Sequence, residues 1–270
     1  MYTILPDDLR IRAACVMQDG ECIAATADID TVYPQYSITK SLVSLVIGML
    51  CSEGKLRLQQ TVGELLGTPA DAPLSRIPLE ALLTMRSGIR DKLLFADRRD
   101  CPDYLAACLA QEITAPRFQY NNADAYLAGR MAEAAADEPL AEWIVRRIFR
   151  PLGIEHFRFE SDPQGHFFAA SGLQITTRDL AKLGQSVLDA GLYSRAWLQT
   201  ATALHTCSDD GRGYGYLFWA DGESCYMSGK WGQKCVILPA YRAVIAVNSE
   251  MPDNEHSLQY AMTLTSYLED

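Results

Sequence analysis

The sequence predicts an α/β protein of the α+β type, in which strands from both ends of the chain form one sheet and helices lie between them. Residues 11–26 alternate about Asp19-Gly20, a strong signal for a two-residue hairpin turn. Residues 55–160 show helical spacing, whereas residues 214–249 contain short runs typical of antiparallel strands. Because strands need partners to bury their faces, we expect the two ends of the chain to meet in one sheet.

These changes in pattern predict a single domain of two lobes. Residues 1–53 and 171–270 are expected to form an α/β lobe that contains the sheet, and residues 54–170 a mostly helical lobe. Residues 37–53 are apolar on nearly every face and are followed by Gly54, a residue that commonly ends helices. This segment predicts a buried central helix.

The remaining elements follow in chain order. Segments with helical length or spacing before residue 160 are LQQTVGELL, LEALLTMRSGI, PDYLAACLAQ, NNADAYLAGRMAEAA and PLAEWIVRRIFRPLGI. A further helix is expected from Thr176 or Thr177, as the N-cap, to Gly191. Three or four antiparallel strands are expected in YGYLFW, ESCYMSG, QKCVILP and RAVIAVNS, and DNEHSLQYAMTLTSYL predicts a C-terminal amphipathic helix.

Composition excludes several classes of partner. Of the 270 residues, 49% are hydrophobic and 21% are charged, which is ordinary for a globular protein. The 34 acidic and 24 basic side chains give a formal net charge of -10, which repels phosphate backbones and anionic membrane surfaces. We therefore expect a small-molecule partner, no nucleic acid and no membrane, while the oligomeric state stays open.

Location and metal content are predicted from three further observations. The N-terminal MYTILPDDLR lacks the pattern of a secretory signal, and the eight cysteines include no Cys-x-x-Cys, so we expect reduced thiols and a cytoplasmic protein. The longest apolar run, residues 42–51, is shorter than the roughly 20 residues that span a bilayer. The four histidines share no metal-ligand spacing, so no metal is expected.

Ser37 and Lys40 are the first candidates for chemistry. Residues three apart lie on one face of a helix, so the Lys40 amine can approach the Ser37 oxygen. Ser37 also opens its helix, where the positive end of the dipole stabilises an alkoxide, whereas the similar Ser52…Lys55 pair lies at the negative end. The structural alternative makes Ser37 an N-cap and lets Lys40 extend to solvent.

Two further motifs strengthen the catalytic interpretation. Tyr120-Asn121-Asn122 supplies a phenol and an amide, although by itself it could be a helix cap. Lys230-Trp231-Gly232 stands directly before a predicted strand, where glycine would let a substrate approach the sheet edge. The same letters at residues 182–184 fall inside a predicted helix and are the expected chance match.

Together, Ser37-x-x-Lys40, Tyr120-x-Asn122 and Lys230-x-Gly232 resemble the signatures of the class C β-lactamase, penicillin-binding protein and esterase superfamily of serine hydrolases. EGKLRLQQTVGELL, LEALLTMRSGI, IFRPLGI and ASGLQITTRDLAKLG also agree, over residues 11–250. The resemblance implies the β-lactamase/transpeptidase-like fold, with a five-stranded antiparallel sheet, flanking helices and an all-α lobe. It also implies that no organic cofactor is needed.

By the same resemblance, each residue has an expected role. Ser37 is the nucleophile, Lys40 its base and Tyr120 a proton relay to the leaving group. Asn122, Lys230, Trp231 and Gly232 are expected to bind substrate, and the backbone N–H groups of Ser37 and Gln233 to form the oxyanion hole. Burial of Lys40 would lower its pKa and make it a base.

Two features of the third motif bear on the substrate, and they point in different directions. Many esterase-like members of the family replace the lysine of this motif, whereas Lys230 is retained here and leaves a cation in the site. Where β-lactamases and DD-peptidases usually carry Thr or Ser, this chain has Trp231, which favours neutral substrates with an acyl or aromatic group. The leading hypothesis is therefore a cytoplasmic esterase or amidase, with acyl transfer as an extension. The alternatives are a β-lactamase or DD-peptidase, and a ligand-binding or sensor module without turnover.

Overall fold

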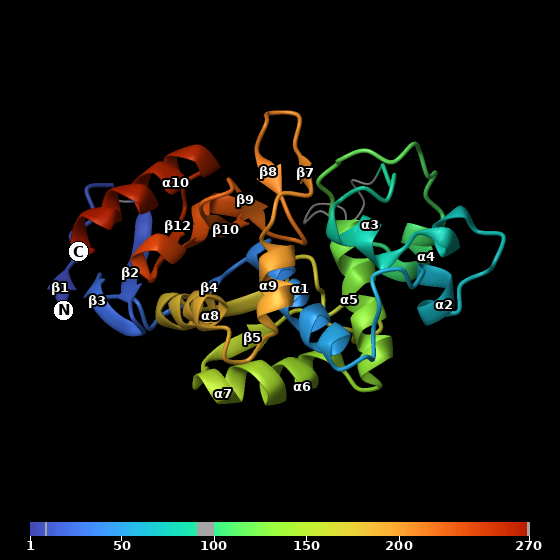
Figure 1. Cartoon of the computed structure of the whole chain (residues 1–270), viewed down its shortest axis with the longest axis horizontal. Helices are drawn as coiled ribbons and strands as arrows, with labels where there is room; N and C mark the ends of the chain where they lie inside the picture. The colour runs from blue at the N-terminus through green and yellow to red at the C-terminus, as the bar shows by residue number, and fades with distance from the viewer. Residues whose placement is uncertain (9, 91–99, 269–270) are drawn as a thin grey trace.

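A large sheet forms one half of the molecule in the computed structural model, which describes residues 1–8, 10–90 and 100–268. Its strand order is β1-β3-β2-β12-β11-β10-β9-β8-β7. The strands are β1 (Tyr2–Thr3), β2 (Ile11–Gln18), β3 (Glu21–Ala25), β7 (Thr206–Cys207), β8 (Gly213–Tyr214), β9 (Trp219–Ala220), β10 (Cys225–Gly229), β11 (Gln233–Leu238) and β12 (Ala243–Ser249). Figure 1 shows both termini at the sheet end and α1 near the centre.

The sheet joins the two ends of the chain, as predicted. β2 pairs antiparallel with β12, with Val16 opposite Ile245. The hairpin between β2 and β3 turns at Asp19 and Gly20, whose φ values of 50° and 83° are the left-handed pair that a type I′ turn requires. The first and last strong strand signals in the sequence therefore become neighbours.

The expected count of five strands is corrected to nine within the described residues. The five longest strands, β3-β2-β12-β11-β10, are consecutive and antiparallel, but β1 adds a parallel pair at one edge. At the other edge, β7, β8 and β9 have two residues each. A strand of two residues is too short to show an alternation of polar and apolar side chains. The run YGYLFW is therefore predicted as one strand, although the structure divides it between β8 and β9.

Helices cover both faces of the sheet. On one face, Cys15 and Met17 belong to the main core with α8 (Thr177–Asp189), and on the other, Ala14 and Val16 pack with α10 (Asn254–Thr263). Figure 1 shows α10 above the sheet and α8 below it. Burial on both faces explains why the central strands are nearly continuous apolar runs.

Helix α1 (Ile38–Ser52) lies at the centre of the molecule. All thirteen residues from Ile38 to Leu50 are buried, as the sequence predicts for this segment. At Gly48, an added Cβ would lie 2.2 Å from Cδ1 of Trp197 in α9 (Arg195–Ala201), so the two helices pack closely there. Gly54, with φ of 73°, follows the end of the helix.

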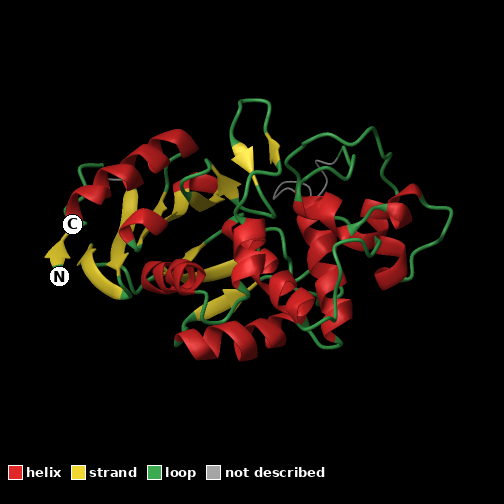
Figure 2. Cartoon of the chain, in the orientation of Figure 1, coloured by secondary structure: helices red, strands yellow, loops and turns green. Residues whose placement is uncertain are grey.

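The region between α1 and α8 is mainly helical. The helices are α2 (Val62–Leu66), α3 (Leu79–Leu83), α4 (Tyr104–Leu109), α5 (Asn122–Ala136), α6 (Leu140–Ile144) and α7 (Arg150–Leu152), with a π-helical turn at Val145–Phe149 between the last two. Figure 1 and Figure 2 show α2 to α5 on the side away from the large sheet, whereas α6 and α7 lie along the bottom of the view, beneath β5 (Phe157–Phe159) and α8. Short 3-10 turns occupy Pro73–Arg76, Lys230–Gly232, Pro239–Tyr241 and Leu264–Tyr267.

Two features of this region differ from the sequence-based expectation. A second sheet, β4-β6-β5, pairs β4 (Val32–Pro34) and β5 (Phe157–Phe159) with β6 (Leu173–Thr176), so the region expected to be helical contains a strand. Helix α8 begins after the predicted Thr176 cap but ends at Asp189, two residues before the predicted end at Gly191. The division of the chain into two lobes stays a prediction. No helix within the described residues has the length and apolarity needed to cross a bilayer.

Candidate active site

Ser37 stands at the first position before α1, but its side chain does not cap the helix. Its backbone has φ of -68° and ψ of -7°, and its hydroxyl makes no capping hydrogen bond. Instead, Lys40 Nζ donates to Ser37 Oγ at 3.0 Å. The structural alternative of an N-cap with an outward lysine is therefore not what this helix shows. The chance match at Ser52 differs, because its Oγ donates to the Gly48 carbonyl.

Lys40 is enclosed by neutral acceptors. The residue is 1% exposed, and besides Ser37 its Nζ donates to Asn122 Oδ1 and to the Ala170 carbonyl, each at 2.8 Å. Desolvation of the ammonium lowers the pKa of Lys40 to about 7. Lys40 can therefore exchange a proton near neutral pH.

Tyr120 completes a contact group with Ser37 and Lys40. Burial raises the pKa of Tyr120 to about 12, while a hydrogen bond with Ser37 acts in the opposite direction. Lys40 Nζ lies 5.1 Å from the centroid of the Tyr120 ring. The ring stacks on Trp219 with centroids 5.6 Å apart. The phenol is thus held beside the hydroxyl in its protonated form.

Asn121 and Asn122 divide two tasks that the sequence could not separate. Asn121 is the N-cap of α5, since its side chain accepts from the Asp124 N–H at 2.7 Å. This leaves Asn122, the first residue of the helix, to direct its carbonyl oxygen at Lys40. The interpretation of this motif as a helix cap is therefore correct for Asn121 but not for Asn122.

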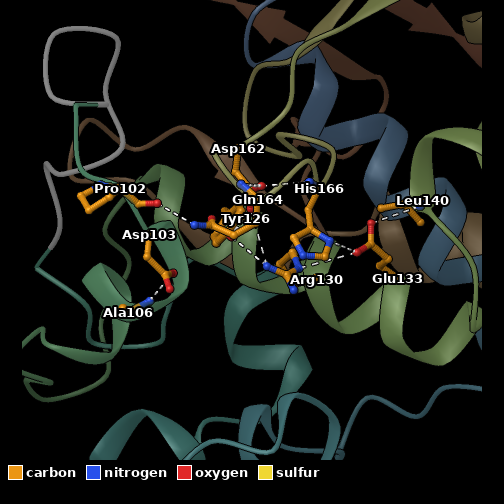
Figure 3. A network of polar contacts seen from close by, with 10 residues as sticks. All are labelled: Pro102, Asp103, Ala106, Tyr126, Arg130, Glu133, Leu140, Asp162, Gln164 and His166. Carbon is orange, nitrogen blue, oxygen red and sulfur yellow. Dashed lines mark hydrogen bonds and ion pairs between the residues drawn. The ribbon is translucent and has the colours of Figure 1, made fainter.

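The Ala170 carbonyl reaches Lys40 because the preceding segment is fixed to α5. The fully buried Asp162 carboxylate accepts from the Tyr126 hydroxyl at 2.6 Å and from the backbone N–H groups of Gln164 and His166 at 3.0 and 2.9 Å. Figure 3 shows these contacts converging from α5 and from the segment after β5. No side-chain pattern marks a backbone acceptor, so Ala170 could not be predicted.

Two further contacts seat the same segment. Arg130 donates to the Tyr126 hydroxyl at 3.0 Å, and Glu133 contacts the His166 ring, as Figure 3 shows. At Gly129 an added Cβ would lie 2.2 Å from the Ala169 Cβ, so the segment approaches α5 as closely as a glycine allows. Helix α5 therefore positions both the Asn122 and the Ala170 acceptors.

The third motif is divided between a turn and a cavity wall. Lys230, Trp231 and Gly232 connect β10 to β11, and only Lys230 lines the cavity that contains Ser37. Trp231 has φ of 62° and is 40% exposed. At Gly232 an added Cβ would lie 2.4 Å from Ser249 Oγ, so this glycine allows close packing within the protein. The structure does not bring Trp231 and Gly232 together with Ser37 in this cavity.

Gln233, the expected oxyanion residue, is also absent from the lining residues. It is 3% exposed, and its side-chain amide donates to the Ser249 carbonyl at 2.7 Å. The wall is formed instead by Ser228 and Gly229 at the end of β10, together with Lys230. Sequence reasoning missed Ser228 and Gly229, and the only signal for them is that this Ser-Gly pair stands directly before the third motif.

Gly229 holds this wall close to the nucleophile. An added Cβ there would lie 2.3 Å from the carbonyl oxygen of Gln35, two residues before Ser37. Behind the wall, the buried Lys234 Nζ donates to Ser228 Oγ at 2.9 Å and to Asn254 Oδ1 at 3.1 Å. Desolvation is the main cause that lowers the pKa of Lys234 to about 7, and the positive charge of the nearby Arg212 acts in the same direction.

The cavity measures about 1040 Å³ and combines an aromatic wall with charged groups. Phe118, Tyr120 and Trp219 form the aromatic side, so the indole of this cavity belongs to Trp219 rather than to Trp231. Trp219 lay in a run predicted only as a strand. Within the described residues, no three His, Cys, Asp or Glu side chains are grouped so that they could hold a metal ion.

Comparisons with known proteins identify the family. The beta-lactamase family model matches residues 12–264. The octameric penicillin-binding protein homologue from Pyrococcus abyssi superposes with a TM-score of 0.79 at 21% identity, over 95% of this chain and 74% of that one. A putative 6-aminohexanoate-dimer hydrolase from Bacillus anthracis gives 0.77 at 20% identity, over 97% and 80% of the two chains.

A putative beta-lactamase from Bacteroides dorei gives a TM-score of 0.77 at 19% identity, over 93% of this chain and 92% of that one. Identities of this size show a common fold, and the family model covers nearly the whole chain. The resemblance inferred from the three motifs is thereby confirmed: the protein belongs to the beta-lactamase family of serine hydrolases.

Proposed function

We propose that the protein forms an acyl-enzyme on Ser37 and acts on a small ester or amide, with water or a second small nucleophile as the acyl acceptor. The observation that carries this proposal is the 3.0 Å contact between Lys40 Nζ and Ser37 Oγ. A buried amine with a pKa of about 7 is partly neutral at physiological pH, so its lone pair can accept the hydroxyl proton.

Acylation then follows from the three contact residues. Ser37 Oγ bonds to the substrate carbonyl carbon as its proton passes to Lys40, and the carbonyl electron pair moves onto oxygen. Tyr120, protonated because its pKa is about 12, donates its proton to the leaving oxygen or nitrogen as that bond breaks. The Lys40 ammonium returns a proton to the tyrosine oxygen.

Deacylation uses the same groups in reverse. Water attacks the acyl carbon and gives its proton to the Lys40 and Tyr120 pair, after which the bond to Ser37 Oγ breaks and the hydroxyl is restored. The oxyanion needs two N–H donors, and the Ser37 N–H at the start of α1 is the first. The predicted second donor, Gln233, does not line the cavity, whereas Lys230 does. We propose the Lys230 N–H for this role.

The direct test uses a fluorophosphonate probe and the matched Ser52→Ala variant as control. We expect one adduct, mapping to Ser37 by peptide mass, in the wild type and in Ser52→Ala, and none in Ser37→Ala. Ser52 is a fair control because it has the same spacing to a lysine but bonds the Gly48 carbonyl. An adduct on Ser52, or no adduct, would contradict the nucleophile assignment.

A substrate panel separates this proposal from its two alternatives. The same acyl-enzyme could open a β-lactam, and named structural neighbours include a penicillin-binding protein homologue and a putative beta-lactamase. We expect faster turnover of a chromogenic short-chain ester than of a cephalosporin or a D-Ala-D-Ala peptide. A stable adduct without turnover of any of the three would favour a sensor module.

A further inference from the structure

Two cysteines contact each other on the hairpin of β2 and β3. Cys15 lies on β2 and Cys22 on β3, and their Sγ atoms are 3.5 Å apart. Both are free thiols. A sulfur–sulfur bond is about 2.0 Å long, so small side-chain rotations would bring the two atoms to bonding distance. The pair lies apart from the active site, because β12 and β11 separate β2 from β10 in the sheet.

A β-bulge in this hairpin places Cys22 on the same face of the sheet as Cys15. The register shifts between Val16 and Met17, so that Met17 lies opposite Cys22. Residues two apart on a strand point to the same face, and Cys15, Met17 and Cys22 all pack with the main core that α8 covers. A regular register would turn Cys22 to the opposite face, away from Cys15.

The two thiols differ in their access to solvent and in their acidity. Cys15 is fully buried, whereas Cys22 is partly exposed. A hydrogen bond from the Cys15 thiol is the main cause that lowers the pKa of Cys22, and the positive charge of Arg178 acts in the same direction. The same hydrogen bond, followed by burial, raises the pKa of Cys15. Cys22 therefore has the properties of a nucleophilic thiolate, and Cys15 those of a thiol that keeps its proton.

Arg178 belongs to the first turn of α8 and is fixed beside the hairpin. Its Nε donates to Asp30 Oδ1 at 2.6 Å, and its backbone N–H donates to the Ile29 carbonyl at 3.1 Å. Asp30 raises the pKa of Cys22, but its effect is smaller than that of Arg178. A cation that favours the thiolate is thus held in place by the segment that follows β3.

We propose that Cys15 and Cys22 form a redox-active dithiol that a small hydroperoxide, such as hydrogen peroxide, oxidises to a disulfide. The Cys22 thiolate attacks one peroxide oxygen, so a sulfur–oxygen bond forms as the oxygen–oxygen bond breaks. The hydroxide that leaves takes up the proton that Cys22 had released, and Cys22 becomes a sulfenic acid.

The second step uses the buried thiol. Cys15 Sγ bonds to Cys22 Sγ, the sulfur–oxygen bond breaks, and the oxygen leaves as water with the proton from Cys15. The two thiols together lose two electrons, and hydrogen peroxide is reduced to two molecules of water. A dithiol reductant reverses the oxidation by thiol–disulfide exchange.

Oxidation of the folded protein tests the pairing. After treatment with hydrogen peroxide, the remaining thiols are blocked with N-ethylmaleimide, and the protein is digested without reduction by a protease that cleaves after glutamate. Glu21 lies between the two cysteines, so a disulfide holds together two peptides that otherwise separate. We expect a mass loss of about 2 Da that maps to Cys15 and Cys22 and that dithiothreitol reverses. A disulfide between other cysteines, or no disulfide, would overturn the proposal.

Variants separate the roles of the two thiols. Cys15→Ser keeps a donor to Cys22 but removes the second sulfur, so oxidation should stop at a sulfenic acid that dimedone labels on Cys22. In Cys22→Ser, oxidation of the buried Cys15 should be at least about tenfold slower than oxidation of Cys22 in the wild type. The mapping in the wild type decides the proposal even where a substitution at the buried position lowers stability.

Cys207→Ser is the matched control, because Cys207 is exposed and lies on β7, at the far edge of the sheet from β3. This variant should form the Cys15–Cys22 disulfide at the wild-type rate. In the wild type, Cys22 should react with hydrogen peroxide at least about tenfold faster than Cys207. Equal rates at Cys22 and Cys207 would contradict the proposed activation of Cys22.

Discussion

Lys40 illustrates how the surroundings of one side chain determine its chemistry. A buried ammonium normally needs a carboxylate partner, but the acceptors here are a hydroxyl, an amide and a backbone carbonyl. Without a negative partner, desolvation dominates and lowers the pKa to about 7. The spacing of Ser37 and Lys40 was readable from the sequence, whereas the neutrality of the other acceptors required the fold.

Replacing Lys40 by arginine should separate charge from basicity. Arginine keeps the cation but does not lose its proton in this pH range, so it cannot accept one from Ser37. We expect Lys40→Arg to lower kcat for a short-chain ester by at least about a hundredfold while circular dichroism shows a folded protein. Near-normal turnover in this variant would remove Lys40 as the base.

Tyr120→Phe tests the proton relay. The variant keeps the ring that stacks on Trp219 but removes the hydroxyl that contacts Ser37. We expect turnover to decrease by about tenfold or more, with the acyl-enzyme accumulating because deacylation needs the same group. Intact-mass measurement during turnover detects that species. Unchanged steady-state rates would show that Tyr120 only shapes the cavity.

At the scale of elements, the site depends on two close approaches made at glycines. The end of β10 meets the segment before α1 at Gly229, and the segment after β5 meets α5 at Gly129. The sequence predicted β10, α1 and α5 but neither β5 nor the two contacts, because a glycine signals permissive packing without naming its neighbour. The same limit explains the third motif. Its residues were recognised, but which of them face the cavity depends on where the β10–β11 hairpin turns.

Gly229→Ala should impair the site without unfolding the protein. Its new methyl group would lie 2.3 Å from the Gln35 oxygen and push the cavity wall away from Ser37. Misplacement of about 1 Å can reduce rates by about a hundredfold, so we expect a loss of kcat/KM of about tenfold or more. Gly191→Ala is the control, since nothing lies within 4 Å of its added Cβ. Equal activities of the two variants would contradict the proposed wall.

Asp162→Asn tests the support of the Ala170 acceptor. The buried carboxylate accepts from Tyr126 and from two backbone N–H groups, and an amide replaces one acceptor oxygen by a donor. We expect the free energy of unfolding in urea to decrease by about 1 to 3 kcal/mol. Glu138→Gln, in an exposed pair with Arg146, should change it by less than about 1 kcal/mol. Equal effects would show that the Asp162 network is not structurally important.

At the scale of the whole molecule, the sequence predicted the architecture better than the edges of the sheet. The Asp19-Gly20 turn, the apolar central helix and the C-terminal strands all left strong signals in the sequence. The pairing of β2 with β12 was expected because strands at the two ends of the chain need partners in one sheet. The two-residue strands, β5 and the set of residues that line the cavity were not predictable, because they depend on residues brought together only by folding. The fold thus collects, around one nucleophile, groups taken from distant parts of an acidic chain.

The rate of Ser37 modification as a function of pH tests the central claim most directly. The Lys40 amine must lose its proton to act, so the second-order rate of fluorophosphonate labelling should rise with pH through about 7 and then level off. Lys234 also has a pKa lowered to about 7 but contacts Ser228, so Lys234→Met should keep this midpoint, whereas Lys40→Arg should abolish the rise. A midpoint near the ordinary pKa of lysine, about 10.4, or one that moves with Lys234 rather than with Lys40, would contradict the account.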